Sequence, residues 1–328
     1  MPDSREIVAR AITFASPPRL PVDFPPEFGS DFALTGMTPS PDYRPSRGVD
    51  EWGAEWENIG VCHLGEVSRF PLADWNEFDK LKIPDIHDPS RWRKLKTARK
   101  EAGDKFLLAD GVSIYERVHF IRGLENTWLD IYDHPRELCR LVDILVEMNL
   151  AAIEKYAEAG ADGLLILDDW GLQNRLMVPP QSWIEIWKPR YRRIFEAAHG
   201  AGLYTFLHSC GYILEILDPL IDCGLDVIQL DQQENMGLEL LGERFRGRIA
   251  FFCPVDIQQT MARGSLAEIR AYCQKMAGCL GTSKGGFIPR WYSDPEGAGH
   301  SQEAIRAMCQ EFLAISREQF GVAGERPL

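Results

Sequence analysis

From Lys105 onward the chain alternates short, almost uniformly apolar runs with longer amphipathic stretches. The runs have strand length and lack polar alternation, which is typical of parallel strands that are buried on both faces. The stretches between them repeat apolar residues with helical spacing, as in Leu138, Leu141, Val142 and Leu145. The predicted strands are Phe106–Ala109, Gly163–Leu167, Leu203–Leu207, Asp226–Leu230, Ile249–Cys253 and Gly286–Pro289.

The amphipathic stretches predict a helix after each strand. One follows Pro135, and the others cover Trp183–His199, Ile213–Cys223, Leu238–Phe245, Leu266–Leu280 and Ala304–Phe320. Counting a further strand at Leu20–Phe24, this alternation favours a (β/α)8 TIM barrel. An open doubly wound sheet is the alternative, but no G-x-G-x-x-G follows any strand to support a dinucleotide site.

The first hundred residues are rich in proline and predict loops rather than helices. We interpret residues 29–98 as a loop-rich elaboration over the mouth of the barrel, with short strands of its own. A closed barrel can include most of a chain of this length in one domain. Residues 1–328 are therefore expected to form a single domain.

The chain has 328 residues, 45% of them hydrophobic, and its 36 Lys and Arg against 49 Asp and Glu give a net charge of −13. This charge argues against a nucleic-acid or anionic-membrane surface, which needs a cationic footprint. No long apolar run predicts a membrane span, and no signal peptide is recognisable, so we expect a cytoplasmic protein with reduced cysteines.

The reactive groups of such a barrel lie where its strands end. His208 and Cys210 follow one strand two positions apart, so their side chains share a face and suit zinc. The alternative is a hydrogen-bonded core histidine beside a buried free cysteine, and on spacing alone this alternative is favoured.

Carboxylates, aromatics and amides follow the other strands. Asp168 and Asp169 are adjacent, so one should face the barrel axis and the other the helix layer. Either can act on a substrate or hold backbone N–H groups. The further candidates are Asp110 as a catalytic carboxylate, and Trp170, Gln232, Trp291 and Tyr292 as substrate-binding residues. The alternative for the aromatic residues is packing in the core, and for Gln232 it is hydrogen bonding to the backbone of neighbouring loops.

The chain resembles the uroporphyrinogen decarboxylase superfamily, and within it the branch of corrinoid- and coenzyme M-linked methyltransferases. The most specific segments are Asp168-Asp169-Trp170-Gly171-Leu172-Gln173 and His208-Ser209-Cys210-Gly211. Others include Asp50-Glu51-Trp52-Gly53 and Gly285-Gly286-Phe287-Ile288, so the resemblance spans nearly the whole chain.

The resemblance implies a barrel with the site at its mouth and a zinc ion held by His208, Cys210 and a third ligand. The methyltransferases of this branch use a second cysteine there, but no cysteine lies between Cys279 and Cys309. Asp294 is the predicted third ligand; Ser293 and His300 lie in the same region, and Cys253 is a further candidate. Gln173 ends the first of the two specific segments, so the resemblance implies that it also binds substrate.

The implied function is transfer of a methyl group between a small methylated donor and a corrinoid carried by a partner protein. The donor would be a methoxylated aromatic, a methylamine or a methylthiol, and a homodimer is compatible with the resemblance. The alternatives are a decarboxylase, for which the arginine-rich N-terminal segment of that branch is not found, and a metal-free barrel that binds a ligand without turnover.

Overall fold

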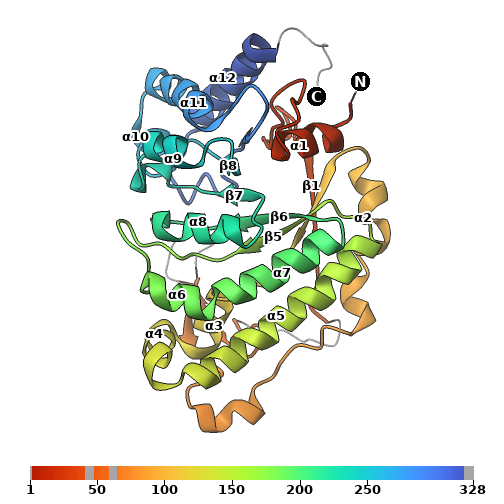
Figure 1. Cartoon of the computed structure of the whole chain (residues 1–328), viewed down its shortest axis with the longest axis vertical. Helices are drawn as coiled ribbons and strands as arrows, with labels where there is room; N and C mark the ends of the chain where they lie inside the picture. The colour runs from red at the N-terminus through yellow and green to blue at the C-terminus, as the bar shows by residue number, and fades with distance from the viewer. Residues whose placement is uncertain (1, 41–47, 59–64, 321–328) are drawn as a thin grey trace.

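Seven parallel strands form the wall of a barrel in the order β1-β4-β5-β6-β7-β8-β9 in the computed structural model (Figure 1). The structure describes residues 2–40, 48–58 and 65–320. The seven strands are β1 (Phe32–Gly36), β4 (Phe106–Asp110), β5 (Gly163–Leu167), β6 (Tyr204–His208), β7 (Val227–Gln229), β8 (Ala250–Cys253) and β9 (Phe287–Pro289). This arrangement confirms the predicted α/β barrel.

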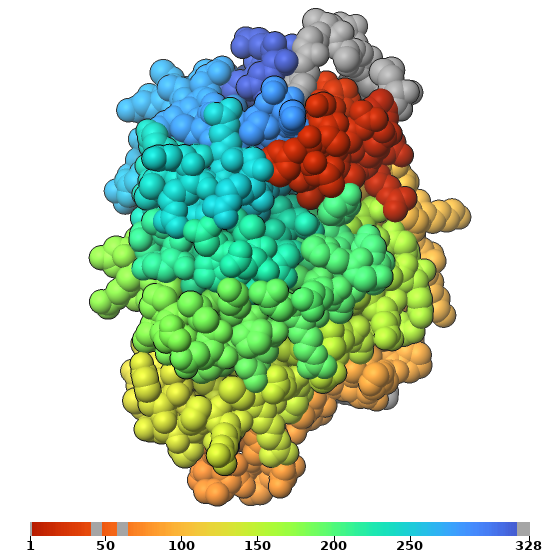
Figure 2. All heavy atoms as spheres, in the orientation of Figure 1, coloured from red at the N-terminus to blue at the C-terminus, as the bar shows by residue number. Residues whose placement is uncertain are grey.

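Apart from α1, the helices lie outside the sheet and follow the strands around it (Figure 1). Figure 2 shows successive parts of the chain, from yellow through green to blue, as consecutive bands across one face of the molecule. The longer helices are α1 (Ser4–Ile12), α2 (Leu95–Ala102), α4 (Leu124–Asp133), α5 (Pro135–Glu158), α7 (Lys188–Gly200), α8 (Leu214–Asp222), α9 (Leu238–Phe245), α11 (Leu266–Leu280) and α12 (Gln302–Phe320). The shorter ones are α3 (Glu116–Arg122), α6 (Pro180–Ile186), α10 (Thr260–Arg263) and the 3-10 helices η1 (Trp75–Lys80), η2 (Pro89–Trp92) and η3 (Gln233–Asn235). None of the helices in the described ranges is both long and apolar enough to span a membrane.

An extended segment near Asp23 closes the wall between β9 and β1. The N–H of Asp23 donates to the carbonyl of Pro289 at 3.1 Å, and the N–H of Trp291 donates to the carbonyl of Asp23 at 2.9 Å. The N–H of Asp31, just before β1, donates to the carbonyl of Val22 at 2.8 Å. The eighth position of the barrel is therefore a bridge rather than a regular strand.

The predicted strand at Leu20–Phe24 is thus reduced to an isolated bridge at Asp23. Prolines at 21, 25 and 26 remove the N–H groups that a continuous ladder needs. The strand that sequence analysis missed is β1, which lies within residues 29–98 and pairs with β4 from Phe32 to Gly36. The same range contains the antiparallel hairpin of β2 (Glu55–Asn58) and β3 (Gly65–Arg69).

One apolar cluster fills the lumen of the barrel. Its strand residues are Phe32, Phe106, Leu108, Leu165, Phe206, Val227, Ala250, Phe252 and Ile288, and Val8, Ala11 and Ile12 of α1 join them. Since side chains alternate across a strand, the residues two positions beyond this layer also face the lumen. They include Asp110, Leu167, His208, Gln229 and Arg290, and they form the mouth.

Candidate functional site

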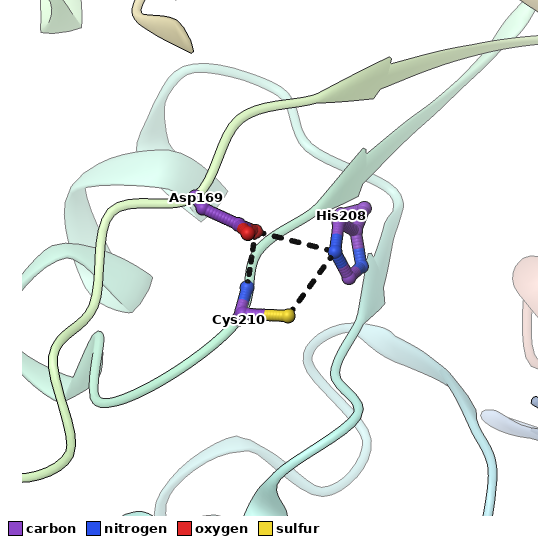
Figure 3. Close-up of side chains that lie close together, drawn as sticks. All are labelled: Asp169, His208 and Cys210. Carbon is purple, nitrogen blue, oxygen red and sulfur yellow. Dashed lines mark hydrogen bonds and ion pairs between the residues drawn. The ribbon is translucent and has the colours of Figure 1, made fainter. Parts of the chain in front are cut away.

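Asp169, His208 and Cys210 converge at the carboxyl ends of β5 and β6 (Figure 3). Nε2 of His208 lies 3.2 Å from Oδ1 of Asp169 and 3.5 Å from Sγ of Cys210. One ligand atom from each residue lies within 4.8 Å of the other two. Tetrahedral ligands at zinc bond lengths of about 2.0–2.3 Å are separated by about 3.3–3.8 Å, so the two separations measured from Nε2 of His208 are close to those of a zinc site.

Backbone contact between two glycines fixes the loops that carry Asp169 and Cys210. The N–H of Gly171 donates to the carbonyl of Cys210 at 3.2 Å. A Cβ on Gly171 would stand 2.3 Å from the backbone nitrogen of Tyr212, and one on Gly211 would stand 2.2 Å from the carbonyl oxygen of Gly171. Only glycine allows this approach, which explains physically why both segments, 168–173 and 208–211, contain a glycine.

Hydrogen bonds hold the three side chains together. The N–H of Cys210 donates to Oδ1 of Asp169 at 2.7 Å. Burial alone would lower the pKa of His208, but the hydrogen bonds to Asp169 and Cys210 outweigh it and raise that pKa well above its usual value. Burial raises the pKa of the Cys210 thiol to about 11, although His208 opposes this shift. Bound zinc would instead deprotonate the thiol.

Asp168 faces away from the lumen and organises the start of α3. Its carboxylate accepts the backbone N–H groups of Ile114, Tyr115 and Glu116 at 2.9–3.0 Å and the hydroxyl of Tyr191 at 2.6 Å. Burial raises the pKa of Asp168 to about 6, and these donors limit the rise. Both of its oxygens are occupied and the side chain has no exposed surface, so the structure shows Asp168 in an architectural role, and its catalytic role stays a prediction.

Trp170 lies in the same outer layer. Its ring is fully buried and stacked on Tyr115 with centroids 3.7 Å apart, and its Nε1 donates to the hydroxyl of Tyr191 at 2.9 Å. The ring therefore packs in the main core and not in the lumen cluster, and a substrate-binding role for Trp170 stays a prediction. Cys253 is also buried; it packs in the outer core and not with the lumen cluster, and burial raises its pKa to about 12.

The loops after β7 and β9 border the three-residue group. Gln232 accepts the N–H of Gly211 at 2.7 Å through Oε1, so it supports the cysteine loop directly. Tyr292 is partly buried and lies within electrostatic range of Asp231, Cys210 and Asp169. Its pKa is raised to about 12, first by burial and then by these acidic groups, so its hydroxyl keeps its proton.

The other predicted residues lie around this group. Asp294 stands apart from the cluster, and its Oδ1 accepts the N–H of Gly297 at 3.2 Å. Trp291 is partly buried against the main core, and His300 is buried with Nε2 3.0 Å from the carbonyl of Ile257. The exposed residues Gln173 and Ser293 lie in loops of the same mouth.

Asp110 ends β4 on the lumen side and lines a cavity of about 550 Å³ with residues of β1 and α2, including Thr35 and Thr97. Although it is open to solvent at the mouth, the surrounding walls bury enough of the carboxyl to raise its pKa to about 6. It remains a candidate proton-carrying group, separate from the Asp169, His208 and Cys210 cluster.

Glu116 is the residue of the site that sequence analysis missed. Its carboxyl accepts a backbone hydrogen bond from Asp169 and interacts electrostatically with Asp168 and His208. Burial is the largest cause that raises its pKa, to about 8, and the two aspartates add to the rise. The residue opens α3 rather than following a strand directly, so reading the strand ends could not find it.

Comparison with known proteins agrees with this architecture. The family model of uroporphyrinogen decarboxylase (URO-D) matches residues 66–288. The methylcobamide:CoM methyltransferase MtaA of Methanosarcina barkeri is 28% identical over 108 residues, which are 32% of this chain and 30% of that protein. A solved methyltransferase from Methanosarcina mazei superposes with a TM-score of 0.69 at 16% identity, over 95% of this chain and 99% of its own. The last likeness shows a shared fold.

Proposed function

Because the chain belongs to the uroporphyrinogen decarboxylase family, we propose that it is a zinc-assisted methyltransferase of the corrinoid-linked branch. It would move a methyl group between a small methylated donor and a corrinoid on a partner protein, as in demethylation of the donor. The observation that carries this proposal is the convergence of Asp169, His208 and Cys210 at the mouth of the barrel. The resemblance to MtaA, although it spans a minority of both chains, supports the same branch.

The donor set suits zinc. It combines a carboxylate oxygen, an imidazole nitrogen and a thiolate sulfur, all of which zinc accepts, and the separations from the imidazole nitrogen to the other two are close to those of tetrahedral coordination. Three protein ligands leave a fourth position for a reacting molecule. Asp169 therefore replaces Asp294 as the third ligand that we propose, because Asp169 already touches His208 and the Cys210 backbone.

A zinc ion held there would act as a Lewis acid toward a thiol or toward the heteroatom that carries the methyl group. The protein's own residues position the reaction. Gln232 holds the Gly211 backbone, so the Cys210 side chain stays directed at the mouth. Tyr292, with its proton retained, can donate a hydrogen bond to a molecule bound beside Cys210. The apolar lumen layer excludes water from below.

A decarboxylase that acts on a substrate with many carboxylates is less well supported. Three aspartates face the described mouth, namely Asp110, Asp169 and Asp231, and they would repel such a substrate. Arg290 supplies one guanidinium in the same layer. Several arginines would be needed to bind several acid groups through paired hydrogen bonds.

Metal analysis and a methyl-transfer assay test the proposal. We expect about one zinc per chain in protein rinsed with a weak chelator, and loss of that zinc in Cys210→Ser. Cys139→Ser, on the outer helix α5, is the matched control and should retain zinc. With free methylcobalamin and a panel of thiols, the absorbance change of demethylation should occur in wild type and the control and be lost in Cys210→Ser.

The two alternatives have distinct outcomes. Wild-type protein without zinc that nevertheless releases carbon dioxide from a porphyrinogen would support the decarboxylase. Protein that binds neither zinc nor methylcobalamin, and in which His208→Ala leaves ligand binding unchanged, would support the metal-free barrel. Either result would remove the methyltransferase proposal.

A further inference from the structure

Arg290 places a cation inside the mouth of the barrel. It follows β9 and stands two residues beyond Ile288, which belongs to the lumen cluster. Its guanidinium carbon lies 4.8 Å from the centroid of the Phe252 ring, and that ring stacks on Phe32 in the lumen. The side chain therefore lies along the inner wall, with 16% of it exposed.

The guanidinium of Arg290 makes no hydrogen bond with the described residues. Its Nε is buried and unpartnered, and the carboxylate of Asp23 approaches it only to 4.0 Å. Oδ1 of Asp23 is already engaged by the hydroxyl of Ser30 at 2.8 Å. A largely buried guanidinium that makes no hydrogen bond is costly, so its N–H groups are available to a ligand.

The other buried arginines are bonded fully by the fold. Arg91 pairs with Glu51 and donates to the carbonyl of Asp85 at 2.6 Å. Arg122 pairs with Asp130 through Nε at 2.7 Å. Since the fold provides hydrogen-bond partners for these two guanidinium groups, the guanidinium of Arg290, which lacks them, indicates that a bound ligand supplies its partner.

Arg290 and Cys210 lie in the same row of the strand register. The register pairs His208 with Gln229, Ile228 with Phe251, and Phe252 with Ile288. Continued two residues beyond His208 and Ile288, it sets Cys210 in one row with Arg290. The strands β6 and β9 are three steps apart, and steps of about 4.8 Å place them within about 14 Å along the wall. Because the side chains of Cys210 and Arg290 both point inward, the gap between the thiol and the guanidinium is shorter than this backbone distance. A small molecule can span it.

We infer that Arg290 binds a single acid group, a carboxylate or sulfonate, of the small molecule whose reacting end meets the Asp169, His208 and Cys210 group. This inference rests on the proposed function, because it takes that group as the reacting end. A planar guanidinium can donate two parallel hydrogen bonds to such an acid, and this one lies over the Phe252 ring. The acid belongs either to the methyl donor or to the thiol acceptor.

Matched acid and amide probes test the inference by calorimetric titration of the purified protein. The donor pair is 4-methoxybenzoate with 4-methoxybenzamide, and the acceptor pair is 3-mercaptopropionate with 3-mercaptopropanamide. We expect the acid of one pair to bind at least about tenfold more tightly than its amide. That preference should vanish in Arg290→Met, which keeps an unbranched side chain, and survive in part in Arg290→Lys. The pair that shows it identifies the source of the acid.

Zinc content separates this inference from the proposed function. Arg290→Met should retain the zinc of wild type and melt at a similar temperature, because Arg290 is not a ligand. Equal binding of acid and amide in wild type, a preference that survives in Arg290→Met, or no binding of either acid up to about 10 mM would overturn the inference. Loss of the acid preference in Arg290→Met with no zinc in wild type would support the acid site and contradict the zinc proposal.

Discussion

Asp168 and Asp169 are neighbours in the chain, and their carboxylates face opposite sides of the barrel wall. Asp168 accepts three backbone N–H groups at the start of α3, whereas Asp169 contacts His208 and the backbone of Cys210 in the mouth. Strand alternation thus gives two adjacent carboxylates separate tasks, one in the architecture and one in the site.

Exchanging each aspartate for asparagine should separate these tasks. In Asp168→Asn an amide NH2 must face two donors, which leaves buried donors unpaired, so we expect a loss of about 2–4 kcal/mol in the free energy of unfolding. Urea denaturation followed by circular dichroism measures it. Zinc per folded chain should stay unchanged.

Asp169→Asn is the matched substitution. This variant should lose zinc. Because Asp169 is partly exposed, the free energy of unfolding of the metal-free protein should fall by less in Asp169→Asn than in Asp168→Asn. If both variants lost the same stability and both retained zinc, the division of tasks between the two carboxylates would be refuted.

Most of the barrel was predictable because parallel strands covered by helices need continuous apolar runs. The strand Gly163–Leu167 and the helices Leu238–Phe245 and Leu266–Leu280 match their predicted bounds. The predicted helix Trp183–His199 is instead two helices, α6 and α7, because Pro189 lacks an N–H and favours the first turn of a new helix. Strand β1 was missed since its run is short and follows proline-rich loops.

The site was predictable only where it depends on strand alternation. The side chains of His208 and Cys210 share a face, as their spacing indicates. That Asp169 rather than Asp168 joins them depends on which residue of β5 faces inward, and the sequence alone left this open. The position of Asp294 depends on a loop whose course no periodic pattern describes. Glu116 reaches the site because Asp168 holds the start of α3.

Bound zinc should raise the free energy of unfolding, and the increase should grow with the zinc concentration relative to its Kd. A ligand that binds only the folded state adds about 2.7 kcal/mol at a hundredfold excess over its Kd, so chelator-treated protein should melt at a lower temperature than zinc-loaded protein. Asp169→Asn should abolish this difference, and Asp294→Asn should preserve it. Thermal melts with and without zinc measure both. The opposite pattern would restore Asp294 as the third ligand.

Asp110 should make stability depend on pH. Its pKa in the folded protein is about 6 because of burial, above the value of about 3.9 in an unfolded chain. The folded state therefore binds the proton more tightly, and the contribution of Asp110 falls as pH rises from about 4 to about 6. Asp110→Asn should gain stability relative to wild type over this range, by less than about 1 kcal/mol because solvent screens the open mouth.

Urea unfolding at pH 4, 5, 6 and 8 measures this difference. Asp104→Asn, an exposed position before the opposite end of β4, is the control and should show no such trend. A difference between Asp110→Asn and wild type that stays constant with pH would contradict the assignment.

The ion pair of Arg91 and Glu51 should contribute far more to stability than the exposed pair of Arg69 and Glu55. Arg91 has 2% of its side chain exposed and Arg69 has 77%. Arg91→Met leaves the Glu51 carboxylate without its partner and should cost about 3–5 kcal/mol. Arg69→Met should cost about 0–1 kcal/mol. Denaturant titration of both variants measures the contrast, and equal costs would contradict it.

The contact between Gly171 and Gly211 should be essential to the metal site, and Gly202 provides the control. Gly211 and Gly202 both have positive φ, at 74° and 80°, but a Cβ on Gly202 would meet nothing within 4 Å. Gly202→Ala should therefore cost only the strain of the backbone, about 1 kcal/mol. Gly211→Ala adds an overlap with the carbonyl of Gly171, so the loops bearing Asp169 and Cys210 must separate. We expect several times that cost and a loss of zinc in elemental analysis. Zinc retained in Gly211→Ala would show that the ligands do not depend on this contact.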